Sequence, residues 1–133
     1  TDRWDRLLGQ GGRAWGFAND DSHVPTDDGV AWNVALCDGR EPASVLDALR
    51  SGRFYASTGV EIVGIECAGR AVRLRTANAQ RIAVHSDFGR REAAVDGDSI
   101  EYVLPEHLDA RYIRFECWGP GEAMAWTQPF FVA

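Results

Sequence analysis

Apolar residues alternate with polar ones along the second half of the chain, from Gly59 onward. Such alternation is typical of antiparallel strands that bury one face and expose the other. Turn-forming residues separate five segments of this kind, and together they predict an antiparallel β-sandwich over residues 59–133. The residues expected to face its core are Ile65, Leu74, Val84, Ile113 and Phe115.

The pattern is clearest in residues 111–116, where Ile113 and Phe115 alternate with Arg114 and Glu116. A strand over these residues points the two apolar side chains into the core. We therefore expect the two charged side chains to face water.

Helical spacing of apolar residues occurs twice in the first half of the chain. Trp4, Leu7 and Leu8 predict a helix over residues 1–8 that ends at Gly9. A second helix is expected to begin at Pro42, which suits a first helical turn, and to carry an apolar stripe on one face. That stripe consists of Val45, Leu46 and Leu49.

Between these helices, short apolar runs at residues 14–18 and 30–36 do not alternate, which is typical of parallel strands buried on both faces. With a further strand ending near Ser57, the order is helix, strand, loop, strand, helix, strand, as in α/β proteins. We therefore assign the chain to the α+β class. Residues 1–58 are expected to form a partial α/β segment, and residues 59–133 the all-β sandwich.

The net charge of the chain argues against some classes of binding partner. Twenty acidic residues against fourteen basic ones give a net charge of −6, which disfavours general binding to nucleic acid or to anionic membranes. The apolar stretches fall well short of the roughly 18 residues that a membrane span needs. We expect no membrane association and a cytoplasmic location.

Three cysteines, an odd number without any C-x-x-C spacing, favour reduced thiols over a disulfide framework. Cys67 and Cys117 are about as far apart as the inter-sheet pair of an immunoglobulin domain. A disulfide between them stays open as the alternative.

The strongest chemical signal is the loop that follows residues 14–18. It contains Asp20, Asp21 and His23, and the single residue between Asp21 and His23 lets both side chains reach one cation from a bent loop. A carboxylate with an imidazole suits zinc, manganese or iron. The plainer interpretation is a solvated turn, because Asp is a common turn former.

Three segments resemble the last part of PHP-domain proteins, the polymerase and histidinol phosphatase superfamily. They are residues 4–8, residues 15–23 and residues 48–59, and the resemblance covers most of residues 1–62. Its specific parts are the DDSH turn at residues 20–23 and the run GRFYASTG at residues 52–59. In the similar branch a small β-sandwich often follows the barrel and ends in a pattern like residues 126–130.

This resemblance implies a metal-dependent phosphoesterase whose distorted seven-stranded barrel holds two or three metal ions. It implies that Asp21 and His23 are the last two metal ligands, and that Asp20 supports the turn without binding metal. The phosphoester substrate would belong to the intact parent protein, here expected to be bacterial.

The chain departs from the family in one large respect. A PHP site begins with a His-x-His motif and collects further ligands from several strands, whereas the other histidines here, His85 and His107, lack ligand partners at a useful spacing. We therefore expect weak binding of a divalent metal and little or no activity from this chain alone, with the missing barrel portion or a second copy as its partner. The alternative is a non-catalytic β-sandwich that binds a partner, a glycan or itself.

Several other residues favour structural roles. We interpret Asp27, Asp28 and Gly29 as a turn, and residues 57–59 as another turn, since no base accompanies Ser57 to make it a nucleophile. The tryptophans at positions 4, 15 and 32 are expected to pack in the core more than to line a substrate pocket.

Overall fold

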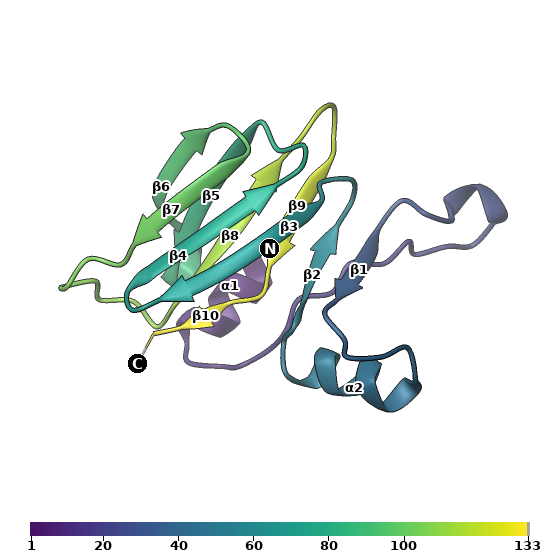
Figure 1. Ribbon diagram of the computed structural model, residues 1–133, viewed down its shortest axis with the longest axis horizontal. Helices are drawn as coiled ribbons and strands as arrows, with labels where there is room; N and C mark the ends of the chain where they lie inside the picture. The colour runs from purple at the N-terminus through teal and green to yellow at the C-terminus, as the bar shows by residue number, and fades with distance from the viewer. Residues whose placement is uncertain (133) are drawn as a thin grey trace.

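The computed structural model describes residues 1–132 and is mostly β, with two antiparallel sheets packed face to face (Figure 1). Over these residues the larger sheet has seven strands: β1 (Trp32–Ala35), β2 (Phe54–Ser57), β5 (Arg81–Ser86), β6 (Arg90–Asp96), β8 (Tyr112–Trp118), β9 (Met124–Thr127) and β10 (Phe130–Phe131). The smaller sheet consists of β3 (Ile62–Ala68), β4 (Ala71–Thr76) and β7 (Ser99–Val103). The antiparallel sandwich expected from the alternating pattern is confirmed.

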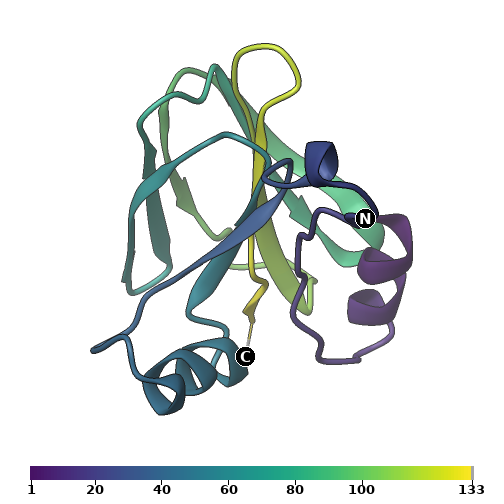
Figure 2. The ribbon, with the colours of Figure 1, turned by 90° about the vertical axis from the view of Figure 1, so that its right-hand side faces the viewer.

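The helices are α1 (Asp2–Gly9) and α2 (Pro42–Arg50), with short 3-10 turns η1 (Pro25–Asp27) and η2 (Asp87–Gly89). Both predicted helices are therefore confirmed. Figure 2 shows α1 against the outer face of the larger sheet, on the side away from the smaller sheet. None of the helices within residues 1–132 is long and apolar enough to cross a membrane.

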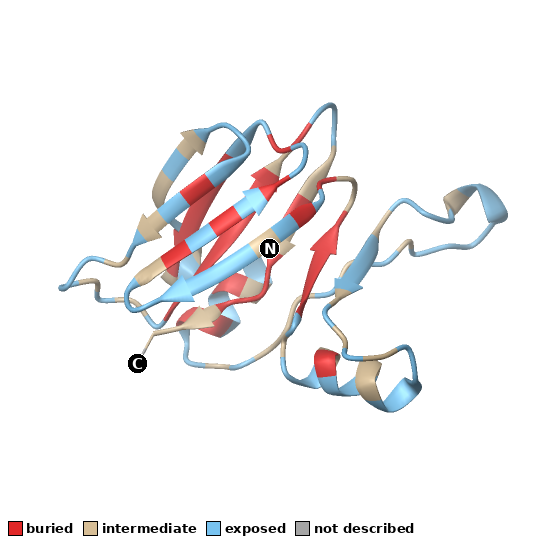
Figure 3. Ribbon diagram, viewed as in Figure 1, coloured by how far each residue is buried: buried red, intermediate tan, exposed pale blue. Residues whose placement is uncertain are grey.

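The core lies between the two sheets, and four of the five predicted inward residues are in it. Leu74, Val84, Ile113 and Phe115 are completely buried. Figure 3 shows the burial concentrated along the central strands of the larger sheet. Burying each such side chain contributes about 1.5 to 3 kcal/mol, so this cluster is the main apolar contribution to folding.

The fifth predicted residue, Ile65, is 40% exposed, so its prediction was wrong. Pairing with Leu74 places Ile65 on the inner face of β3. However, β3 is the edge of the smaller sheet, and Ile65 lines an open groove instead of meeting the larger sheet. Alternation thus identified the face correctly but not the position of the strand within the sheet.

Strands β1 and β2 belong to the larger sheet. Strand β2 is buried along its whole length and pairs antiparallel with β9, so the sheet continues across the boundary expected at residue 58. Residues 30–36 were expected to form a buried parallel strand, and this was wrong. Instead β1 is an exposed edge strand that pairs antiparallel with β2.

Residues 14–18 were also expected to form a buried parallel strand. They run extended but pair with no strand among the described residues, so this prediction too was wrong. Side-chain amides of Gln128 and Asn33 satisfy part of the backbone there, in place of a ladder of strand hydrogen bonds.

The prediction that Arg114 and Glu116 face water was wrong, because both are buried and Arg114 pairs with Asp5 of α1. The side chain of Arg114 is only 1% exposed and makes two hydrogen bonds to Asp5 of α1, at 2.6 and 2.7 Å. It makes a third, at 2.7 Å, to Glu116, and the Tyr112 hydroxyl donates to Asp5 at 2.7 Å. The outer face of β8 is therefore a buried network of charges instead of a solvated surface.

His85 lies at the end of this network, which agrees with its expected structural role. Its Nδ1 is 3.3 Å from the Gly89 carbonyl oxygen. Its Nε2 is 3.5 Å from a Glu116 carboxylate oxygen, within ion-pair distance but without a hydrogen-bond partner among the described residues. His107, in contrast, is an exposed loop residue.

Cys37, Cys67 and Cys117 are all free thiols, as expected for a reduced protein. Cys117 is buried and Cys67 is exposed. Burial, aided by the nearby charge of Glu116, raises the pKa of the Cys117 thiol to about 12. That thiol therefore stays protonated and packs as part of the core.

Substituting Asp5→Asn should lower the free energy of unfolding by about 3 kcal/mol, because it removes one of the two carboxylates, Asp5 and Glu116, that balance the buried Arg114 charge. Urea denaturation measures this directly. The matched control is Glu101→Gln, which removes the same charge from the exposed pair between Arg73 and Glu101 and should cost under about 1 kcal/mol. Equal losses for the two variants would contradict a special role for the buried pair.

The stabilisation from Asp5 should also depend on pH. Burial alone raises the pKa of Asp5, but hydrogen bonds from Arg114 and Tyr112 outweigh it and bring the pKa below its ordinary value. The contribution is therefore complete above the unfolded pKa of about 4 and is lost as pH falls through the folded pKa. The difference in unfolding free energy between wild type and Asp5→Asn should shrink below about pH 4, and a constant difference would contradict it.

Candidate metal-binding site

The candidate site is the loop of residues 19–31, which projects from the body of the molecule (Figure 1). The extended segment 14–18 carries the chain into this loop, and β1 carries it back. Gly16 lies directly against the Trp4 ring, where a side chain would collide with it. The segment therefore packs close to α1 before it reaches the loop.

Aromatic side chains fix segment 14–18 at three points. The indole N–H of Trp4 donates to the Ala14 carbonyl, and that of Trp15 donates to the Arg50 carbonyl at the end of α2, each at 2.9 Å. Phe17 stacks on Phe54 with ring centroids 4.6 Å apart. Trp4 and Trp15 are half-buried against this segment and lie outside the apolar core, and Trp32 is 41% exposed, so the expectation that the three tryptophans pack in the core was wrong.

Asp20 closes the base of the loop. Its carboxylate accepts hydrogen bonds from the backbone N–H groups of Gly29 and Ala31, at 2.8 and 2.7 Å. These bonds lower the pKa of Asp20 and keep it ionised. Both carboxylate oxygens are used within the loop, which agrees with the supporting role expected for Asp20.

Asp27 and Asp28 hold the far end of the loop. The Asp27 carboxylate accepts from the backbone N–H groups of His23 and Val24, and Ser22 donates to Asp28. Gly29 has a φ of 81°, a conformation that glycine adopts without strain. The expected turn is therefore confirmed here. Ser57 is instead the last residue of β2, and its hydroxyl donates to the Val60 carbonyl at 2.7 Å across the bend at residues 58–59.

Asp21 and His23 differ from the other residues of the loop because each has a side-chain acceptor that makes no hydrogen bond. The His23 Nδ1 lies 2.6 Å from the Asp21 carbonyl oxygen, which can only accept a hydrogen bond. In the neutral ring Nδ1 therefore carries the proton, and Nε2 has a free lone pair. No hydrogen bond within residues 1–132 uses this Nε2 or the Asp21 carboxylate.

The backbone of Asp21 is itself unusual. Its φ of 50° lies in the left-handed region, which a non-glycine residue seldom adopts. The Asn19 side chain accepts from the Asp21 N–H at 3.1 Å and supports this conformation. The sharp turn at Asp21 brings its own carbonyl against the His23 ring.

The described residues bring no third ligand to this turn. Within residues 1–132, no three His, Cys, Asp or Glu side chains gather closely enough to hold a metal ion. His85 is committed to the network on the outer face of the sheet. A cation at Asp21 and His23 would take its remaining ligands from water or from another source.

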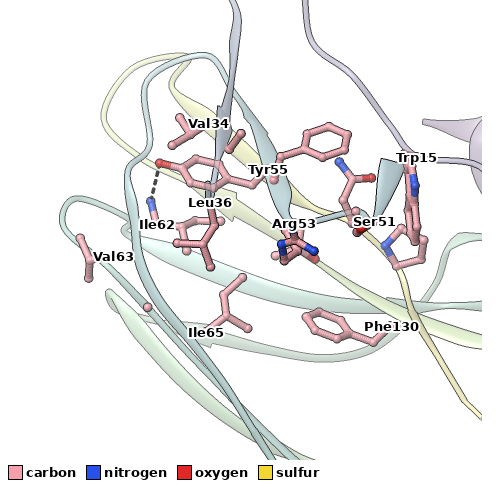
Figure 4. A pocket seen from close by; sticks show the side chains of 17 residues that line it. Trp15, Val34, Leu36, Ser51, Arg53, Tyr55, Ile62, Val63, Ile65 and Phe130 are labelled. Atoms are coloured by element: carbon pink, nitrogen blue, oxygen red, sulfur yellow. Dashed lines mark hydrogen bonds between the residues drawn. The ribbon is translucent and has the colours of Figure 1, made fainter. Parts of the chain in front are cut away.

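A second feature is an apolar groove between β1, β2 and β3, with a volume of about 500 Å³. Figure 4 shows Leu36, Ile65 and Phe130 facing this space, with the Tyr55 hydroxyl accepting from the Ile62 N–H at 3.2 Å. Leu36 is 74% exposed and Val34 is also exposed. The groove is lined mostly by apolar side chains, with Ser51, Arg53, Thr127 and Gln128 among its polar lining residues.

Sequence reasoning missed four residues that prove structurally important here: Asp5, Arg114, Gln128 and Asn33. Asp5 falls on the face of α1 that also carries Leu8, and this spacing was the available signal for its burial. Gln128 and Asn33 gave no periodic signal, because each acts on a backbone distant in sequence. Comparison with family models, with curated proteins and with solved structures found no match.

Proposed function

We propose that this chain is the C-terminal part of a PHP-like metal-dependent phosphoesterase, in which Asp21 and His23 bind one divalent cation. One observation carries the proposal: the carboxylates of Asp20, Asp27 and Asp28 accept hydrogen bonds that hold the loop, whereas the Asp21 carboxylate and the His23 Nε2 accept none. The DDSH turn at residues 20–23 and the run at residues 52–59 that resemble the superfamily support the same assignment.

The donor atoms suit the metals expected from the sequence. Hydrogen bonding of Nδ1 to a carbonyl is the usual way in which a metal-binding histidine is oriented, and it leaves Nε2 for the cation. Asp21 supplies a hard oxygen, so zinc, manganese and iron all fit the pair. When bound, such a cation would stabilise negative charge on the oxygens of a phosphoester.

Two ligands from one loop leave an ion mostly hydrated and mobile, so this chain alone should bind metal weakly. Efficient hydrolysis needs a nucleophile and a substrate in fixed positions, and poor positioning can cost about a thousandfold or more in rate. The parent protein would supply the remaining ligands, and the phosphoester substrate would bind there.

The second candidate is a non-catalytic interaction module, and the exposed edge strand favours it. The outer edge of β1 has no strand partner among the described residues, and Trp32 and Val34 are exposed on it. A second copy of this chain could pair with that edge antiparallel, about a two-fold axis, and cover the apolar residues beside the groove. This candidate needs no metal.

Manganese should bind weakly to the isolated chain and broaden the His23 imidazole resonances in a proton NMR titration. Asp21→Asn and His23→Ala should each weaken this binding about tenfold or more, since each removes one of two ligands. Asp38→Asn is the matched control, because it removes an exposed carboxylate outside the loop and should leave the broadening unchanged. Equal broadening in Asp21→Asn and in wild type would contradict the proposal.

The same chain should show little or no hydrolysis of a generic aryl phosphate with added manganese or zinc. Steady-state release of the aryl alcohol measures this. Robust turnover that both Asp21→Asn and His23→Ala abolish would show that the chain completes a site alone or by oligomerising. The proposal of a partial site would then be wrong.

If the interaction module is correct, the chain should form dimers at high micromolar concentration in sedimentation velocity experiments. Val34→Lys should return it to a monomer, because a charged edge strand resists pairing. Val103→Lys is the control, since Val103 is exposed at the edge of the smaller sheet. A monomeric wild-type chain would exclude self-pairing through β1.

A further inference from the structure

Two side-chain amides hold the segment that leads to the Asp21 turn. The Gln128 side chain accepts from the Gly16 N–H at 2.8 Å and donates to the Gly16 carbonyl at 2.7 Å. The Asn33 side chain makes the same pair of bonds with Ala18, at 2.9 and 2.6 Å. Each side-chain amide thus makes two hydrogen bonds to the backbone of a single residue, one as donor and one as acceptor.

This arrangement copies strand pairing. Residues two apart in an extended chain present their N–H and C=O groups to the same edge, so Gly16 and Ala18 both face the larger sheet. A side-chain amide has the same donor and acceptor as a peptide group. The two amides therefore take the place of a neighbouring strand at alternate positions.

Both amides are fixed to the larger sheet. Gln128 is buried and directly follows Thr127, which pairs with Tyr55. Asn33 lies within β1 and pairs with Ala56 of β2. Because a buried amide is costly unless its hydrogen bonds are made, the Gln128 position is well determined.

The anchors lie close to the proposed ligands. Asp21 is three residues beyond Ala18, and three residues span at most roughly 10 Å of extended chain. Movement of Ala18 would therefore displace the Asp21 carboxylate and the His23 ring that bonds to its carbonyl. If the two ligands are correctly placed in only a fraction of the molecules, the apparent affinity for the cation falls by that fraction. Holding the ligands in place therefore tightens binding.

We infer that Gln128 and Asn33 are positioning residues for the cation site: through Gly16 and Ala18, the sandwich sets where Asp21 and His23 lie. This rests on the proposed function for the identity of the ligands. It assigns the β-sandwich a part in metal binding although it contributes no ligand.

The test uses the full chain with Gln128→Met, which keeps the length of the side chain and removes both hydrogen bonds. Gln80→Met, at an exposed glutamine, is the matched control. Asn33→Val is the second variant, at an exposed position of an edge strand where loss of the amide should leave the core intact. Circular dichroism checks that each variant is folded.

Two measurements are made on each variant. Amide hydrogen exchange should quicken about tenfold at Gly16 in Gln128→Met and at Ala18 in Asn33→Val, because each N–H loses its acceptor. Manganese affinity, followed by broadening of the His23 resonances, should fall about tenfold in both variants and stay unchanged in Gln80→Met. A purely structural role would change the exchange rates without changing the affinity.

Unchanged manganese affinity in Gln128→Met and Asn33→Val, with affinity that still depends on Asp21 and His23, would overturn the positioning role and leave the proposed function intact. Affinity that is insensitive to Asp21→Asn and His23→Ala would overturn both. Should Gln128→Met fail to fold, the Asn33→Val result decides the inference alone.

Discussion

The buried ion pair between Asp5 and Arg114 is the interaction on which the arrangement of this molecule depends. Arg114 lies in the central part of the larger sheet and is nearly inaccessible to water, so its charge is balanced by the Asp5 carboxylate that α1 provides together with Glu116 of its own strand. The pair fixes the place of α1, and Trp4 of the same helix packs on Gly16. The ion pair with Arg114 therefore places α1, and α1 in turn places the extended segment.

From that segment onward, side chains replace regular secondary structure. Gln128 and Asn33 bond to backbone groups that a strand would otherwise satisfy, and the loop beyond them closes through Asp20 and Asp27. Because the side chains of Gln128, Asn33, Asp20 and Asp27 already make hydrogen bonds within the chain, they are not available to bind a ligand. The proposed role of Asp21 and His23 is drawn from that contrast.

The sequence was informative where one local pattern determines the outcome. Alternation identified Leu74 and Phe115 as core residues, because a strand has only two faces. It failed for Arg114, since the identical pattern arises whether a charged face meets water or a helix carrying a compensating charge. The strand expected from the non-alternating apolar run at residues 14–18 also failed, because that run packs against aromatic side chains and its hydrogen-bond partners lie up to 112 residues away. Contacts between residues so far apart in the chain produce no periodic pattern in the sequence.

The central claim is that one cation binds between Asp21 and His23. Crystals of the chain soaked in manganese and measured for anomalous scattering test it most directly. The account predicts an anomalous peak within metal-ligand bonding distance of both the Asp21 carboxylate and the His23 Nε2, with water completing the coordination. A peak at other residues, with none at this turn, would contradict it.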